Sequence, residues 1–323
     1  MNDEDRMEFL GQVAAWYYED DMDQAEIARR IGKSRSMVSR LLSEAREAGL
    51  VQIRVRFPLR TDVVLADEVA DAFGLGEAHV LAGSGDNDAT LRRLGRLGAR
   101  ALQSRLRSGM TVTVGWGAAL HSLVRAMPEI QLQDVMVLQV MGSVGDGDPN
   151  VDGADLARTL SSKLNGDFRA MAAPLIVDRS QAAQSLLADR TIATTLRMAS
   201  SSAVAVTGIG SIDSSLSGLV RAGYFDQAAI TRLRDVGVVG DLMGFLIDDR
   251  GQVLDIPENE RVVALRPEQL SGIDTVIGVA GGPGKANAIT AVLRARRLDV
   301  VVTDAASARA ALAMHGSDEL VEV

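Results

Sequence analysis

The chain of 323 residues contains no cysteine, few aromatic side chains and no long apolar run. The absence of cysteine excludes disulfides and thiolate metal sites, and it favours a reducing compartment such as the cytoplasm. Aromatic residues make up 3% of the chain and apolar residues 47%, so the core must consist mainly of aliphatic side chains. No apolar run reaches the roughly 18–20 residues of a membrane span. We therefore expect a cytoplasmic protein with no membrane partner.

Acidic side chains outnumber basic ones in the whole chain, so its net charge is −9. Between residues 29 and 56, however, eight basic side chains stand against two acidic ones, a local charge of +6 that leaves −15 for the rest of the chain. A basic segment on an acidic body is typical of a protein that meets phosphate with one face. A solvated helix face would give the same pattern, so charge alone leaves both interpretations open.

Helical periodicity marks three short helices in the first 57 residues. Residues 5–20 carry apolar side chains at the i, i+3, i+4, i+7 and i+8 spacing of a helix. Asp23 and Glu26 form a variant of the capping box that starts a second helix, and Gly32 suits its left-handed end. Ser34 can cap a third helix. Two helices joined by a tight glycine turn are typical of a helix-turn-helix, whose second helix enters the major groove of DNA.

The residues after the third helix alternate apolar and polar side chains with a period of two. In residues 50–57 this pattern predicts a strand with its arginines on one face, like the wing beside a recognition helix. Arginine can pair with guanine, and serine can donate or accept hydrogen bonds near bases and phosphates. The residues that we expect to contact DNA are Gln24, Lys33, Ser34, Arg35, Ser36, Ser39, Arg40 and Arg54. A plain three-helix bundle with the same periodicity is the alternative.

Strand-like and helix-like segments alternate beyond a joint at Pro58. Helical patterns cover residues 88–106 and 285–296, and Asp304 can cap a last helix that reaches His315. The expected strands are residues 79–81, 111–115, 135–141, 174–177, 203–207, 262–265, 276–280 and 300–303. This alternation predicts an α/β fold with a parallel sheet covered on both faces, and such folds bind ligands at the carboxyl ends of their strands.

Three glycine-rich loops, residues 114–119, 237–244 and 280–285, are expected at such strand ends. Backbone amides at a helix N-terminus bind anions, and Lys285 would add a positive charge. The loops therefore predict one shared site for a phosphorylated or carboxylated metabolite, with ordinary tight turns as the alternative. A Walker loop is excluded because Ala286 stands where serine or threonine is needed, and a dinucleotide fingerprint because Leu120 stands where glycine or alanine is needed.

Seven short stretches of the chain match a known family in order and spacing. They are Ala15–Tyr18, Gln24–Ala28, Ser34–Leu42, Val114–Gly117, Val239–Asp241, Val279–Gly282 with Lys285, and Val302–Asp304. Each stretch is weak alone, but their combination is specific. The chain resembles a SorC-family sugar-binding transcriptional regulator over essentially its full length.

The resemblance implies a winged helix-turn-helix in residues 1–57 and a large Rossmann-like effector domain in residues 58–323. The latter would be similar to glucosamine-6-phosphate deaminase and ribose-5-phosphate isomerase. It further implies a homo-oligomer, a dimer or tetramer, whose binding to double-stranded operator DNA is controlled by a small sugar, polyol or sugar phosphate. The effector-binding residues that it implies are Gly115, Trp116, Gly117, Asp241, Gly281, Gly282 and Lys285.

The resemblance implies that the glycine loops and Lys285 hold the anionic end of the effector, and that Asp241 accepts hydrogen bonds from the effector's hydroxyls. The chain departs from many relatives at Ala118 and Ala119, where they carry hydroxyl residues that bind phosphate.

A sugar-phosphate isomerase or deaminase fused to a DNA-binding module is the alternative function, and an interaction module without a ligand is a third. Catalysis would need a carboxylate or histidine beside the sugar. His79 and His315 suit structural roles, whereas His121 follows the first glycine loop closely enough to reach a ligand. Asp241 is the acid within a glycine-rich loop and suits hydroxyl binding better. No cluster has metal-ligand spacing, so we expect no metal, no cofactor and no enzyme.

Overall fold

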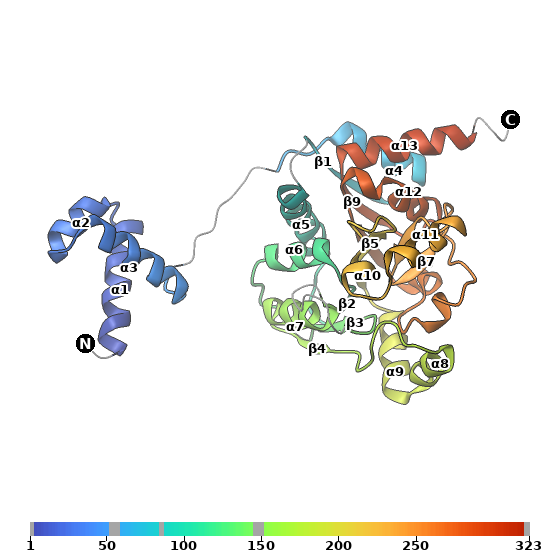
Figure 1. Ribbon diagram of the computed structural model, residues 1–323, viewed down its shortest axis with the longest axis horizontal. Coiled ribbons are helices and arrows are strands. Elements are labelled where there is room, and N and C mark those ends of the chain that lie inside the picture. Colours follow the sequence, from blue (N-terminus) through green and yellow to red (C-terminus); the bar gives the residue numbers. More distant parts are fainter. Residues whose placement is uncertain (1–2, 52–58, 84–86, 145–151, 320–323) are drawn as a thin grey trace. The chain divides into compact units, whose positions relative to one another are not determined.

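The computed structural model describes residues 3–51, 59–83, 87–144 and 152–319 (Figure 1). The chain divides into two compact units, Met1–Pro58 and Leu59–Val323. Each unit has its own hydrophobic core. The greater part of the expected wing, including Arg54, lies outside the described residues.

In residues 3–51, the described part of the first unit, the chain forms three helices, α1 (Asp3–Tyr18), α2 (Gln24–Ile31) and α3 (Arg35–Glu47). The capping box at Asp23 is confirmed, because its carboxylate accepts from the amide of Glu26 while the Glu26 carboxylate accepts from the amide of Asp23. The helix-ending role of Gly32 is also confirmed, by its φ of 62°. These local signals produce the expected helix-turn-helix of α2 and α3.

The three helices share one small core. Apolar side chains of α1, α2 and α3 are buried together, among them Leu10, Ile27 and Leu41. Arg6 of α1 donates to both carboxylate oxygens of Glu44 on α3, at 2.9 and 2.6 Å. Because α3 turns its apolar stripe toward α1 and α2, its opposite side remains in solvent.

The second unit contains ten α-helices, three short 3₁₀ helices and nine strands within its described residues. The helices are α4 (Val63–Phe73), α5 (Asn87–Gln103), α6 (Ala118–Ala126), α7 (Gly153–Leu164), α8 (Ser180–Ala188), α9 (Arg190–Ala199), α10 (Gly218–Arg221), α11 (Gln227–Asp235), α12 (Ala286–Arg294) and α13 (Ala305–Glu319). The strands are β1 (Glu77–Leu81), β2 (Thr111–Val114), β3 (Met136–Gln139), β4 (Asp167–Arg169), β5 (Val204–Ser211), β6 (Gly240–Leu242), β7 (Phe245–Ile247), β8 (Thr275–Val279) and β9 (Val300–Asp304).

Seven strands form a parallel sheet in the order β1-β9-β8-β5-β2-β3-β4. Side chains alternate between two cores along each strand: Val300 and Val302 pack with α5, α6 and α7, whereas Val301 packs with α4, α12 and α13. The sheet is therefore covered on both faces, which confirms the α/β fold expected from the sequence.

The structure corrects three sequence-based expectations. Residues 174–177 and 262–265 form isolated bridges instead of strands, since Ser143 pairs with Pro174 and Ile176 with Val262 at single positions. The second glycine-rich segment is a β-hairpin and not a loop: β6 pairs antiparallel with β5 and β7. Met243 and Gly244, with φ of 57° and 82°, form the tight turn between its strands.

Candidate functional site

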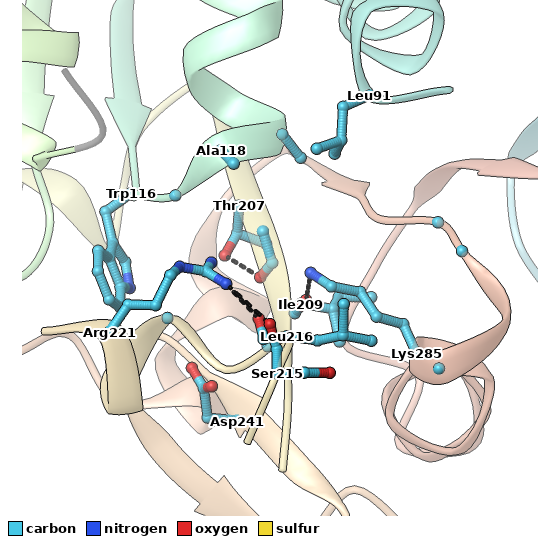
Figure 2. A pocket seen from close by; sticks show the side chains of 18 of the residues that line it. Leu91, Trp116, Ala118, Thr207, Ile209, Ser215, Leu216, Arg221, Asp241 and Lys285 are labelled. Carbon is cyan, nitrogen blue, oxygen red and sulfur yellow. Dashed lines mark hydrogen bonds between the residues drawn. The ribbon is translucent and has the colours of Figure 1, made fainter. Parts of the chain in front are cut away.

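A cavity of about 770 Å³ opens at the carboxyl ends of β2, β5 and β8, which are neighbours in the sheet (Figure 2). Crossovers leave the sheet in opposite directions from β2 and β5, so this is a topological switch point, the usual ligand position in such folds. Its lining residues include Trp116, Gly117, Ala118, Ala119, Gly210, Leu216, Gly218, Arg221, Asp241, Gly281, Gly282 and Lys285.

The loop after β2 brings the start of α6 to the cavity. Gly117, with a φ of 111°, precedes the helix and provides no side-chain cap, and the first turn at Ala118 and Ala119 lines the cavity. Helix N-terminal amides carry partial positive charge and attract anions. Gly115 lies beneath this loop instead of in the cavity wall, where its amide donates to Val206 O at 3.0 Å.

Trp116 and Gly218 form a closely packed part of the wall. A Cβ added at Gly218 would lie 3.0 Å from Cη2 of Trp116, so the indole ring lies directly over the first residue of α10. The indole is partly exposed to the cavity and provides an apolar surface there.

Asp241 is a buried carboxyl group beneath the cavity. It lies on β6 opposite Gly210 of β5. Burial raises the pKa of Asp241 to about 6, although nearby Lys285 and a hydrogen bond with the backbone of Gly244 act in the other direction. A carboxylate in this position can accept hydrogen bonds from the hydroxyls of a ligand.

Lys285 lies across the cavity from Trp116 (Figure 2). It ends the short 3₁₀ turn Pro283–Lys285 before α12, and its ammonium group donates to Ile209 O at 2.7 Å. Burial lowers the pKa of Lys285, the carboxylate of Asp241 raises it, and the guanidinium of Arg221 lowers it. The sequence suggested that an external anion neutralises this lysine, but Asp241 already provides an internal one.

The third glycine-rich loop holds a carboxylate of the chain itself. The amide of Gly282 donates to Oδ2 of Asp304 at 2.5 Å, and the Ser307 hydroxyl donates to the same oxygen at 3.0 Å. The other oxygen, Oδ1, caps α13 by accepting from the amides of Ala306 and Ser307. The Gly282 amide is therefore committed to Asp304, whereas the N-terminus of α6, which has no side-chain cap, also borders the cavity.

Arg221, at the end of α10, is a cavity cation that the sequence analysis did not identify. Its Nη1 donates to the carbonyl oxygens of Leu216 and Ser215, at 3.2 and 3.5 Å (Figure 2). Neutral carbonyl acceptors leave its charge available to an anion. No local motif marks this arginine, because it reaches the cavity only through the fold of the segment after β5.

The first unit carries a second candidate site, the exposed side of α3. Arg35, Ser36, Ser39 and Arg40 are exposed there, and Lys33 is exposed in the turn before the helix. Gln24, at the start of α2, is partly buried. The structure thus brings the expected DNA-contacting residues of the described helices to one helix-turn-helix, with cations beside the first two turns of α3.

Comparison with known proteins gives the family. The family described as "Putative sugar-binding domain" matches residues 58–313. The chain is 30% identical over 310 residues to the transcriptional regulator LsrR of Klebsiella pneumoniae, covering 95% of this chain and 93% of that protein. It is 28% identical to the deoxyribonucleoside regulator of Bacillus subtilis over 310 residues, covering 95% and 98%. The full-length sorbitol operon regulator SorC of Klebsiella pneumoniae superimposes with a TM-score of 0.70 at 26% identity, covering 95% and 99%.

This chain belongs to the SorC family of sugar-binding transcriptional regulators. Its family membership agrees with the resemblance read from the motifs, and the alignments with LsrR and SorC extend through both units.

The remaining candidates of this SorC-family chain have other positions. His121 is absent from the residues that line the cavity. His79 lies beside Glu77, and burial lowers its pKa, while the His315 ring packs against Phe73 with centroids 4.7 Å apart. Within the described ranges, no three acidic or histidine side chains are grouped to hold a metal ion. No described helix is long and apolar enough to cross a membrane.

Proposed function

We propose that this SorC-family chain is a DNA-binding regulator of carbohydrate or polyol metabolism, and that a small sugar, polyol or sugar phosphate controls its operator binding. One observation carries the proposal: a cavity lined by the carboxyl group of Asp241 and by the cations Lys285 and Arg221 lies in the same chain as an exposed helix-turn-helix. The relatives named above are regulators, one of deoxyribonucleosides and one of a sorbitol operon.

The cavity residues suit a polyhydroxylated ligand with one anionic end. Asp241 would accept hydrogen bonds from hydroxyls, and the apolar ring of Trp116 would cover the carbon skeleton. Lys285, Arg221 and the N-terminal amides of α6 would meet the anionic end. Because Ala118 and Ala119 provide no hydroxyl, the backbone and the two cations would replace the side-chain donors that many relatives place there.

Signalling requires that the effector distinguish two states of the regulator. A ligand can shift an equilibrium only by its difference in affinity for the two states. The cavity supplies such a difference if its walls close on the ligand, since these walls come from separate segments after β2, β5 and β8. We propose that the operator-bound and operator-free states differ in how these segments surround the cavity.

The test is a titration of operator binding with and without effectors. DNA from upstream of the chain's own gene is mixed with full-length protein, and complexes are followed by gel shift in the presence of sugars, polyols and sugar phosphates. We expect a selective complex whose midpoint moves at least ten-fold with one class of compound. Binding that is not selective for this DNA would refute the regulator, and selective binding that no compound changes would refute the effector.

The enzyme alternative is tested separately. Among the described residues that line the cavity, Asp241 is the buried acid and none is a histidine. We propose that the ligand is bound and released unchanged. Aldose–ketose interconversion and amine release are assayed with each sugar phosphate that shifts the midpoint, and turnover above the buffer rate would favour the isomerase or deaminase.

A further inference from the structure

Met37 is an apolar side chain on the exposed surface of α3, where its side chain is 38% exposed. The cations of Lys33, Arg35 and Arg40 surround it in sequence, and all three are exposed. Methionine is usually a core residue, but the core positions of α3 are taken by other residues, beginning with Val38. An exposed apolar side chain among cations therefore suits an apolar group that belongs to a polyanionic partner.

The hydroxyls at the start of α3 are already occupied. Ser34 Oγ accepts from the amide of Met37 at 3.2 Å, and it forms a hydrogen bond with Ser36 Oγ at 2.9 Å. The hydroxyl of Ser34 therefore serves mainly as the N-cap of α3, and the hydroxyl of Ser36 is hydrogen-bonded to that capping group. The serines have less capacity for bases than their exposure indicates, which leaves a larger part of sequence reading to Arg35, Met37 and Arg40.

We propose that Met37 is a specificity-determining residue that recognises the C5-methyl group of a thymine in the operator. The inference rests on the proposed DNA-binding function. The thymine methyl is the apolar group that base edges present in the major groove, and N-terminal residues of a recognition helix face those edges. The neighbouring cations complement the phosphates on either side of the groove. Contact between the thioether chain and one methyl group corresponds to about a four-fold change in Kd.

The test removes single methyl groups from the DNA. The full-length protein first selects its preferred duplex from a random pool, and each thymine is then replaced in turn by deoxyuracil, which pairs identically but lacks the methyl group. We expect wild-type binding to weaken about four-fold at one thymine, or at a symmetry-related pair. Met37→Ala should bind the unmodified duplex about four-fold more weakly and should not respond to deoxyuracil at that position.

Met7→Ala is the matched control, because Met7 is a methionine with a similar exposed fraction, 40%, and belongs to α1 and not to the helix-turn-helix of α2 and α3. It should bind as the wild type and keep the full response to deoxyuracil. If deoxyuracil weakens wild type and Met37→Ala equally at every position, or weakens neither, the thymine assignment is overturned while DNA binding stands. If no duplex is selected from the pool, the DNA-binding function itself is refuted, and the role of Met37 with it.

Discussion

The carboxyl group of Asp241 lies over the α-carbon of Gly210, in the space that any side chain at position 210 would fill. The two residues face each other in the antiparallel ladder between β6 and β5. A Cβ added at Gly210 would overlap Oδ1 of Asp241. The hairpin of β6 and β7 can therefore carry a carboxyl group into the cavity floor only because β5 has no side chain at this point.

Gly210→Ala should consequently destabilise the second unit and displace Asp241. Overpacking of this kind costs about 1–3 kcal/mol in the free energy of unfolding, which urea denaturation measures. Gly11→Ala is the matched control, since a Cβ added at Gly11 within α1 meets nothing within 4 Å. A Gly210→Ala protein with wild-type stability and wild-type effector response would contradict the observed packing.

The raised pKa of Asp241 predicts a pH dependence of stability. The folded state holds this proton up to about pH 6, whereas the ordinary value is 3.8. The contribution of this group to the free energy of unfolding is therefore complete below about pH 4. About 3 kcal/mol of it is lost as the pH rises through 6. Asp241→Asn should lack this decrease. The measurement is the difference between the unfolding free energies of the two proteins from pH 4 to 7, and a constant difference would exclude the raised pKa.

Substitution of the two cavity cations should separate effector classes. Lys285→Ala should still fold and bind operator but lose its response to effector, because the ammonium group next to Asp241 is removed. Arg221→Ala should weaken the response to anionic effectors more than the response to neutral polyols. The midpoint of effector titration on the operator complex reports both. Arg232→Ala, at an exposed position of α11, serves as control, and an unchanged midpoint in Lys285→Ala would show that this lysine has no part in sensing.

Arginines in the first two turns of α3 should dominate operator recognition. Arg35→Ala should cost about 1–3 kcal/mol of binding and relax preference at one operator position if it pairs with guanine. The double variant Arg35→Ala, Arg40→Ala should lose selective binding. Arg46→Ala, in the last turn of the same helix, is the control for loss of charge alone. Tight and selective binding by the double variant, measured by fluorescence anisotropy, would refute the assignment.

The chain should form at least a dimer, as the sequence analysis expects. One helix-turn-helix contacts too few bases for useful affinity, and paired modules read two half-sites about one DNA turn apart. Sedimentation equilibrium should therefore give a dimer or tetramer at micromolar concentration. A monomer, both alone and with DNA, would contradict the expectation.

Local signals predicted the helix-turn-helix and most of the sheet. The caps at Asp23 and Ser34 and the glycine at position 32 act within a few residues, so the sequence displays them directly. The continuous apolar run Val300–Val302 likewise follows from burial on both faces of a parallel sheet.

The cavity was harder to predict, because its groups meet through long-range packing. Arg221 comes from a four-residue helix with no motif of its own. The sequence around Gly282 predicts that its backbone amide binds an anion of the ligand. In the structure this amide donates instead to Asp304, twenty-two residues later. In sequence the hairpin of β6 and β7 resembles a loop, because its strands have three residues each and β6 pairs with the distant end of β5.

The placement of the cavity at β2, β5 and β8 has a consequence for how the unit opens. These strands are adjacent in the sheet, but the cavity-lining segments that follow them are spread from residue 116 to residue 285. A molecule held by all three acts as a non-covalent cross-link across that length of chain. Its departure removes the cross-link from all three segments at once, so their amides should gain or lose protection from hydrogen exchange together instead of one segment at a time.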